Sequence, residues 1–185
     1  MKNFVWPLTL GVALALCQTA FAQETPKTDV FLGYSYVRAN PATSGAPAFN
    51  LQGGAGQIAY NFNDYLGVVG DLGGYHVGKL NGVNVNSSLF TYLFGPRLSY
   101  HRSNLLTPYA QVLFGGARAG SGALGAGSEN AFAMTVGGGV DVHPSKHIGV
   151  RLGQVEYLMS RFREISNNRL TQNNLRVSTG ILFRF

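Results

Sequence analysis

Residues 131–143 read AFAMTVGGGVDVH, and the polarity of their side chains alternates from one residue to the next. Phe132 and Val142 fall on one set of alternate positions, whereas Thr135 and Asp141 fall on the other. Since successive side chains of a β-strand point to opposite faces, a period of two predicts a strand with one apolar face and one small or polar face. This stretch therefore favours β-structure.

The same alternation recurs in eight segments of the chain, and it is weaker in five of them. The expected strands are residues 29–38, 50–60, 66–76, 90–100, 106–117, 131–143, 148–158 and 175–185. Within residues 148–158 the phase of the alternation changes after Arg151, which predicts a β-bulge near Gly153. Residues 23–185 show neither the apolar stripe of an amphipathic helix nor an apolar run long enough for a membrane-spanning helix, so the predicted fold class is all-β.

The composition excludes several classes of protein. Charged residues make up 12% of the 185 residues and aromatic residues another 12%, which argues against a disordered chain. A single cysteine excludes a disulfide scaffold and a multi-thiolate metal site. The net charge of +6 comes without any nucleic-acid-binding motif, so no nucleic-acid partner is expected.

The N-terminus has the pattern of a secretory signal peptide. Lys2 precedes an apolar run over residues 5–16, and the small residues Ala20 and Ala22 then predict cleavage before Gln23. The run is too short to span a bilayer as a helix. We therefore divide the chain into a signal peptide, residues 1–22, and a single β-domain, residues 23–185.

The predicted connections between strands alternate in length. Short ones of 5 residues fall at 61–65, 101–105 and 143–147, and long ones of 11 to 15 residues fall at 39–49, 77–87, 118–130 and 159–173. A closed antiparallel barrel in the bacterial outer membrane has short periplasmic turns and longer outer loops. A tilted strand of about 11 residues rises on the order of 28 Å, enough for the apolar band of such a barrel. Because lipid offers backbone groups no hydrogen-bond partners, we expect a closed eight-stranded up-and-down transmembrane barrel.

Aromatic residues near the predicted strand ends suggest the two interfacial girdles of such a barrel. The expected periplasmic girdle is Tyr60, Phe62, Tyr65, Tyr100, Tyr109, Phe183 and Phe185, and the outer one is Tyr34, Tyr36, Phe90 and Phe114.

The other face of each strand predicts a polar interior. The inward positions are Gln57, Asn61, Asp71, Tyr75, Arg97, Ser99, Tyr109, Gln111, Asp141 and Arg151, interleaved with glycines. Buried charges must be paired or neutralised. We therefore expect two ion pairs, Asp71 with Arg97 and Asp141 with Arg151, to plug the lumen. The alternative is a charged constriction in a narrow, porin-like diffusion channel.

Several short motifs support a resemblance to a known family. They are FLGYSY at 31–36, YNFNDYLG at 60–67, FGPR at 94–97 and STGILFRF at 178–185. In this order they resemble the outer membrane protein beta-barrel domain family, of the eight-stranded outer-membrane-protein-A type. The resemblance implies that Ile181, Phe183 and Phe185 form the C-terminal signal read by the barrel-assembly machinery. It also implies contact with periplasmic chaperones during export.

Motifs that imitate catalytic or cofactor sites do not fit this topology. The glycine-rich segment 120–125 lies in a predicted loop with no following helix, so no dinucleotide site is expected. His143 and His147 flank a turn at Pro144, and we interpret them as solvated residues rather than metal ligands. Some outer-membrane barrels of this size are lipid A-modifying enzymes. Here the corresponding His143 and Ser145 would face the periplasm with Glu156 roughly a strand length away, so a relay is not expected. We predict no enzymatic activity, cofactor or metal.

Basic residues gather in and after the last long predicted connection. They are Arg161, Arg163, Arg169 and Arg176. One interpretation is a solvated loop, and the other is contact with lipopolysaccharide phosphates or another acidic surface ligand. The sequence as a whole predicts a monomeric outer-membrane protein that lies among outer-membrane lipid and lipopolysaccharide, with a structural and surface-interaction role.

Overall fold

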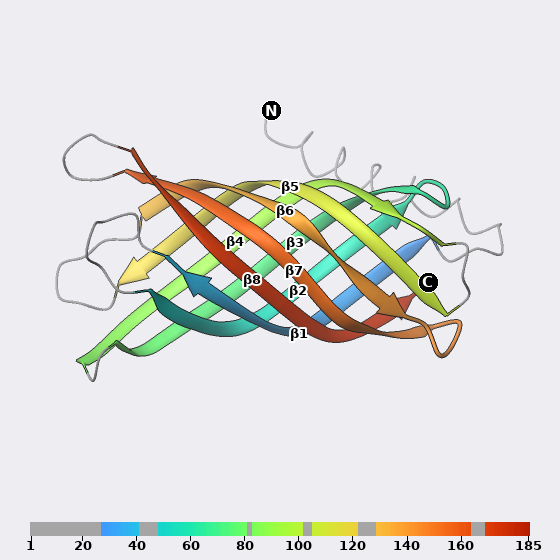
Figure 1. The fold of residues 1–185 in the computed structure, drawn as a ribbon, viewed down its shortest axis with the longest axis horizontal. Coiled ribbons are helices and arrows are strands. Elements are labelled where there is room, and N and C mark those ends of the chain that lie inside the picture. The colour runs from blue at the N-terminus through green and yellow to red at the C-terminus, as the bar shows by residue number, and fades with distance from the viewer. Residues whose placement is uncertain (1–26, 41–47, 81–82, 102–104, 122–128, 164–168) are drawn as a thin grey trace, which may run out of the picture.

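The computed structural model describes residues 27–40, 48–80, 83–101, 105–121, 129–163 and 169–185. The predicted signal-peptide residues Ala20, Ala22 and Gln23 lie outside these ranges. The strands are β1 (Thr28–Ala39), β2 (Phe49–Asn61), β3 (Leu66–Leu80), β4 (Val83–Ser99), β5 (Leu106–Ser121), β6 (Glu129–Val142), β7 (Ile148–Arg163) and β8 (Arg169–Arg184). They form a closed barrel in sequence order (Figure 1), which confirms the predicted architecture. No helix in the described part of the chain has the length and apolar character of a membrane-spanning helix.

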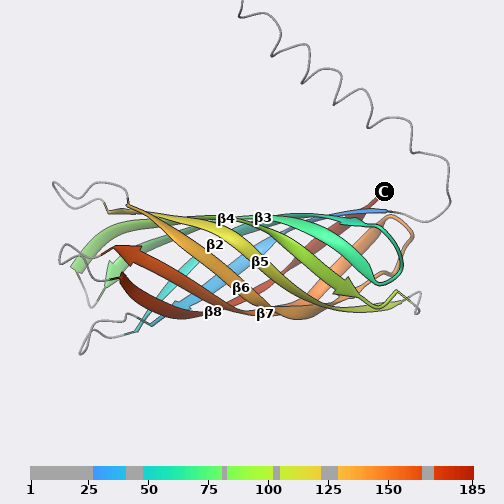
Figure 2. The same cartoon turned by 90° about the horizontal axis from the view of Figure 1, so that it is seen from above.

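Every strand pairs in antiparallel fashion with its two neighbours, and β1 closes the barrel against β8. At this seam the backbone amides and carbonyls of Thr28 and Phe185 exchange two hydrogen bonds of 3.1 and 2.9 Å. The strands are tilted relative to the long axis of the barrel, as both views show (Figures 1 and 2). Closure gives the backbone internal partners, which is the condition for a sheet to sit in lipid.

The barrel has two distinct ends. At one end, which we call the terminal end, lie the first residue of β1, the last residue of β8 and the connections at residues 62–65, 100–105 and 143–147. At the other end, which we call the loop end, lie the other four connections between strands. All four are shorter than predicted, and three of them much shorter, since only residues 81–82, 122–128 and 164–168 separate the paired strands there. The predicted long connections at 77–87, 118–130 and 159–173 are therefore wrong in large part. An antiparallel hairpin keeps its backbone hydrogen bonds beyond the apolar band, where the alternation of the sequence has already faded.

β7 contains the predicted bulge. Val140 of β6 pairs with Gly153, but the next residue, Asp141, pairs with Arg151, so that Leu152 has no partner in the ladder. One extra residue shifts the phase of the strand by one position. Gln154 therefore faces the interior, as Arg151 does.

Large apolar side chains cover the outside of the barrel. Exposed aromatic residues lie near both ends, including Tyr60, Phe62, Tyr65 and Tyr100 at the terminal end and Tyr34, Phe90 and Phe114 toward the loop end. Tyr109 does not belong to this girdle, because its position on β5 directs the ring into the lumen, where it is 6% exposed.

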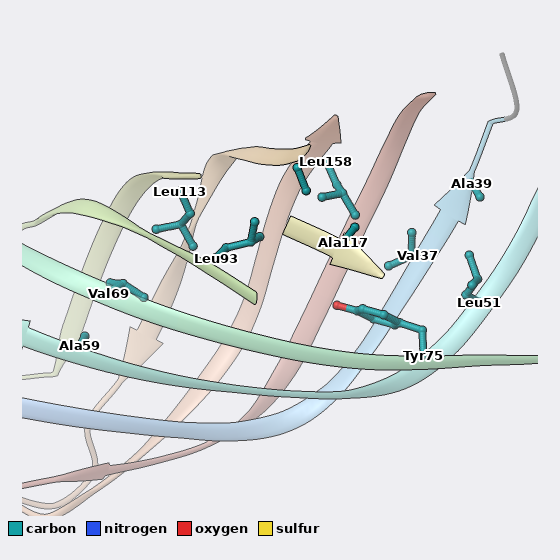
Figure 3. Close-up of a cluster of buried hydrophobic side chains, with 11 residues drawn as sticks. Val37, Ala39, Leu51, Ala59, Val69, Tyr75, Leu93, Leu113, Ala117 and Leu158 are labelled. Atoms are coloured by element: carbon teal, nitrogen blue, oxygen red, sulfur yellow. The ribbon is translucent and has the colours of Figure 1, made fainter. Parts of the chain in front are cut away.

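The interior is only partly polar, which corrects the expectation of a polar axis. The predicted polar positions are indeed buried, but an apolar cluster shares the lumen with them (Figure 3). Its members are Val37, Ala39, Leu51, Ala59, Val69, Tyr75, Leu93, Leu113, Ala117, Ala133 and Leu158. Leu93, Leu113 and Leu158 extend into the lumen from three different strands (Figure 3). An eight-stranded barrel is narrow enough for its own side chains to fill.

Inward glycines make room for this filling. A Cβ atom on Gly95 would lie 2.1 Å from the carbonyl oxygen of Val112 on β5, so no other residue fits without a shift of the backbone.

Candidate functional site

The main polar feature of the molecule is a closed ring of six hydrogen-bonded side chains inside the barrel. We call it the lumen ring. In order around the ring its members are Asp71 (β3), Arg176 (β8), Glu156 (β7), Gln111 (β5), Arg97 (β4) and Gln57 (β2). All six are at most 3% exposed. Six of the eight strands are thus tied together across the lumen by side chains rather than by the backbone ladder.

Arg176 is the ionic centre of the lumen ring. It donates two hydrogen bonds to the carboxylate of Asp71, at 2.8 and 3.1 Å, and its Nε donates to Glu156 Oε2 at 2.6 Å. Two parallel bonds between a guanidinium and a carboxylate are strong and specific in geometry. One arginine therefore binds two carboxylates from two other strands.

Arg97 is held by amides instead of carboxylates. It donates to Gln111 Oε1 through Nε and Nη2, at 3.0 and 2.9 Å, and to Gln57 Oε1 at 2.9 Å. Each glutamine then donates from its own amide nitrogen, Gln57 to Asp71 at 2.7 Å and Gln111 to Glu156 at 2.8 Å. The two glutamines therefore link the cation to carboxylates that it does not touch.

A second group of side chains, which we call the Arg151 brace, lies against the lumen ring. Arg151 binds Asp141 through two bonds of 2.8 and 3.0 Å and donates to Gln57 Oε1 at 2.6 Å. It also bonds to Gln154, whose carbonyl oxygen accepts a 2.9 Å hydrogen bond from Tyr109. The guanidinium groups of Arg97 and Arg151 lie 4.1 and 4.7 Å from the centre of the Tyr109 ring. The brace thus joins β5, β6 and β7 to the ring.

The lumen ring and the Arg151 brace together are electrically balanced. Three arginines, at positions 97, 151 and 176, oppose three carboxylates, at positions 71, 141 and 156. A buried ion pair gains little net energy, because desolvation offsets the attraction, but loss of one partner leaves an uncompensated buried charge. The arrangement therefore fills and fixes the lumen, and its integrity depends on each member.

The structure pairs the predicted charges only in part. Asp141 and Arg151 form an ion pair at 2.8 Å. The predicted Asp71–Arg97 pair is wrong, because Asp71 lies opposite Leu93 in the β3–β4 register, four residues away from Arg97. Asp71 reaches across the lumen to Arg176 instead.

The prediction that Arg176 contacts an acidic surface ligand is wrong, because its side chain lies inside the barrel and is only 1% exposed. The alternation of residues 175–185 contained the signal that places it there, because Leu175 and Val177 occupy the outward positions on either side. For Glu156 the signal lay in the predicted bulge of β7, since this side chain faces inward only because the extra residue resets the phase.

The terminal end of the lumen has a smaller polar cluster. Arg184 binds Asp29 at 2.8 Å, and Asn61 donates to the same carboxylate at 3.1 Å. His143 is 7% exposed, which corrects its interpretation as a solvated residue. Burial, and then the positive charge of Arg184, lower the pKa of the His143 imidazole.

The residues considered for a relay or a metal site do not form one. Glu156 is bound to Arg176 and Gln111, whereas His143 lies near Thr107 at the terminal end. Within the described ranges, no group of three or more His, Cys, Asp or Glu side chains could hold a metal ion.

Four of the other predicted site residues, Arg161, Ile181, Phe183 and Phe185, lie on the outside. Ile181, Phe183 and Phe185 are exposed and form part of the outer surface at the seam. Arg161 is exposed near the loop end of β7, and Arg163 pairs with Arg169 in the β7–β8 ladder. These three arginines therefore extend two paired strands rather than lie in a loop.

Comparison with known proteins agrees with this architecture. Residues 8–183 match the outer membrane protein beta-barrel domain family, and the chain therefore belongs to that family. No curated protein sequence matches the chain significantly.

Solved structures share the fold at low sequence identity. Ail, the attachment invasion locus protein of Yersinia pestis, is 17% identical with a TM-score of 0.61, over 88% of this chain and 100% of Ail. Neisserial surface protein A is 14% identical with a TM-score of 0.68, over 85% and 97%. OprG from Pseudomonas aeruginosa is 11% identical with a TM-score of 0.59, over 88% and 97%. At these identities the likeness establishes the eight-stranded outer-membrane barrel fold.

Proposed function

We propose that the chain is an integral, non-catalytic protein of the bacterial outer membrane whose lumen is closed and whose role is structural and surface-interacting. The observation that carries this proposal is the lumen ring with its Arg151 brace. These side chains occupy the lumen and satisfy one another's charges, with no catalytic relay among the described residues. Family membership supports the location.

Two groups of side chains, which fill the lumen one after the other along the barrel axis, support a closed lumen. Polar side chains cross the lumen on the side of the terminal end, where Arg97 lies two residues from the end of β4. Most of the apolar cluster lies toward the loop end, where Val37 and Leu51 adjoin the connection between β1 and β2. An ion would have to break charge-assisted hydrogen bonds and then cross an apolar zone, and both steps oppose conduction.

The outer surface supports an orientation with the loop end facing the exterior of the cell. The terminal end then faces the periplasm, where Ile181, Phe183 and Phe185 are accessible to the assembly machinery and to chaperones during export. Arg161, with Arg163 and Arg169, lies at the level of outer-leaflet headgroups. There arginines contact anionic groups such as lipopolysaccharide phosphates.

Labelling of single cysteines in intact cells tests this location and orientation. A Gly125→Cys variant carries its thiol between β5 and β6, and the matched Lys146→Cys variant carries it in the turn between β6 and β7. We expect a membrane-impermeant maleimide to label the first in intact cells and the second only after permeabilisation. Labelling of Lys146→Cys alone in intact cells would contradict the orientation, and recovery of the chain in the soluble fraction would contradict the location.

The second candidate function is a narrow diffusion channel, favoured by the charges that line the lumen. Such a channel would conduct ions steadily, whereas a closed barrel would not. A lipid A-modifying enzyme is a third class, and it predicts that expression of the chain changes the mass spectrum of lipid A. We expect an unchanged acyl pattern, because Glu156 is engaged by Arg176.

A further inference from the structure

A shallow apolar groove of about 620 Å³ crosses the outside of the barrel from β1 to β5. Two rows of outward side chains, which run across the strands, form the walls of the groove. The backbone of the row of inward-facing residues between them forms its floor. The exposed members of the walls are Leu32, Ile58, Leu72, Tyr92, Phe94 and Phe114. The floor residues Gln57 and Asp71 direct their side chains into the lumen, so the open side of the groove faces away from the barrel.

Glycines deepen this groove without being required by packing. A Cβ atom on Gly70 would meet nothing within 4 Å, whereas one on Gly95 would strike the backbone of β5. Outward positions of a membrane barrel normally carry large apolar side chains. Gly70 therefore leaves open space in the wall, in the middle of an apolar surface.

Exposed arginines lie beyond the β5 end of the groove. Arg118 follows Phe114 by four residues on the same face of β5, which is about 13 Å along the strand toward the loop end. Its register partner on β6 is Asn130, and two residues further along β6 Phe132 pairs with the exposed Arg161 of β7. The surface is thus apolar along the groove and positive at one end of it.

We propose that this groove and these arginines form one binding site for an outer-leaflet lipid, the lipid A part of lipopolysaccharide. An acyl chain lies in the groove, and a phosphate contacts Arg118 and Arg161. The inference rests on the proposed function, which places the loop end outside and Arg161 at the headgroup level. It adds the acyl-chain groove and Arg118, which the sequence patterns did not single out.

Charge complementarity selects this occupant over a second copy of the chain. Two barrels inserted in the same direction would bring their arginines to the same level of a shared interface, and like charges there repel. A phosphate-bearing lipid instead matches both features, since arginine binds phosphate strongly and the groove is apolar. A basic residue at the surface gives about a fivefold preference for an anionic lipid.

Fluorescence quenching by brominated lipids tests the site directly. Trp6 is the single tryptophan of the chain, so a Trp6→Phe, Tyr92→Trp variant carries its only tryptophan in the groove. The variant is reconstituted into phosphatidylcholine vesicles that contain a minor fraction of one brominated lipid. We expect brominated phosphatidylglycerol to quench the reporter more than the same fraction of brominated phosphatidylcholine. Unbrominated lipid A should relieve this excess quenching.

Matched variants separate the two parts of the site. Gly70→Leu fills the groove and should abolish the excess quenching, whereas Val150→Leu, an outward change on β7, should keep it. Arg118→Gln should lower the preference for the anionic lipid about fivefold, whereas Lys146→Gln at the opposite end should keep it.

Two results would overturn the proposal, namely equal quenching by the two brominated lipids and failure of lipid A to relieve the excess. Quenching by a vesicle made wholly of brominated phosphatidylcholine shows that the barrel lies in the bilayer. If that control fails, the proposed function fails as well; if it succeeds without any excess, the groove proposal alone is refuted.

Discussion

Arg176 joins three buried side chains of the lumen, because it binds Asp71 and Glu156 and also donates a 3.4 Å hydrogen bond to Tyr75. Tyr75 in turn contacts Ser35 of β1, at 3.3 Å between the hydroxyl oxygens. At the scale of single residues, the stability of the barrel should therefore be sensitive to substitution at this position.

We predict that Arg176→Met lowers the free energy of unfolding by about 3–5 kcal/mol, because it leaves two buried carboxylates without their cation. Urea titration of the detergent-folded protein, read from its heat-modifiable migration on a gel, measures this change. Arg161→Met removes an exposed arginine and should alter the midpoint little. Equal losses in the two variants would show that the Arg176 pairs do not stabilise the lumen.

His143 predicts a pH dependence of stability. Because its pKa is lowered in the folded barrel, the unfolded chain binds a proton at pH values where the folded chain does not. The free energy of unfolding should therefore fall as the pH drops below the ordinary histidine pKa of about 6.5. His143→Gln should weaken this dependence between about pH 7 and pH 5. The same slope in both proteins would refute the assignment to His143.

At the scale of elements, the bulge in β7 decides which side chains reach the lumen ring. If all residues of β7, Leu152 included, alternated regularly without a bulge, Gln154 and Glu156 would share the outward face of Val150. A one-residue slip moves a whole set of side chains to the opposite face.

Deletion of Leu152 should leave the barrel able to fold, since Gly153 then takes the outward position after Arg151 and Glu156 keeps its place in the lumen. Refolding into detergent, followed by the gel assay, gives the result. Deletion of Gly125, between β5 and β6, is the matched control and should leave the heat-modifiable band intact. Loss of the heat-modifiable band after Leu152 deletion alone would show that the barrel needs the bulge itself and not only the inward phase that it gives to Glu156.

Strand positions were predictable from the sequence because each strand has a period of two, and the bulge was predictable from the break in that period. The partners of the buried charges were not. Pairing across the lumen depends on strand register and on the reach of long side chains, as the Asp71–Arg176 pair shows. The extension of β3 to β8 beyond the apolar band was missed because backbone pairing leaves no hydrophobic pattern there.

At the scale of the whole molecule, two layers of side chains fill the lumen, one of balanced charges and one of apolar side chains. The sequence predicted the first through its alternation but not the second, because inward leucines such as Leu93 and Leu113 resemble outward ones in a single strand. Only the closed sheet shows that they converge.

Single-channel recording of the unmodified protein in planar bilayers tests the closed lumen most directly. We expect no steady conductance from inserted, heat-modifiable protein, and none from Arg97→Ala either, because the apolar cluster still fills the lumen when the lumen ring is broken. Steady conductance of the unmodified protein that rises further in Arg97→Ala would contradict the closed lumen and identify a channel.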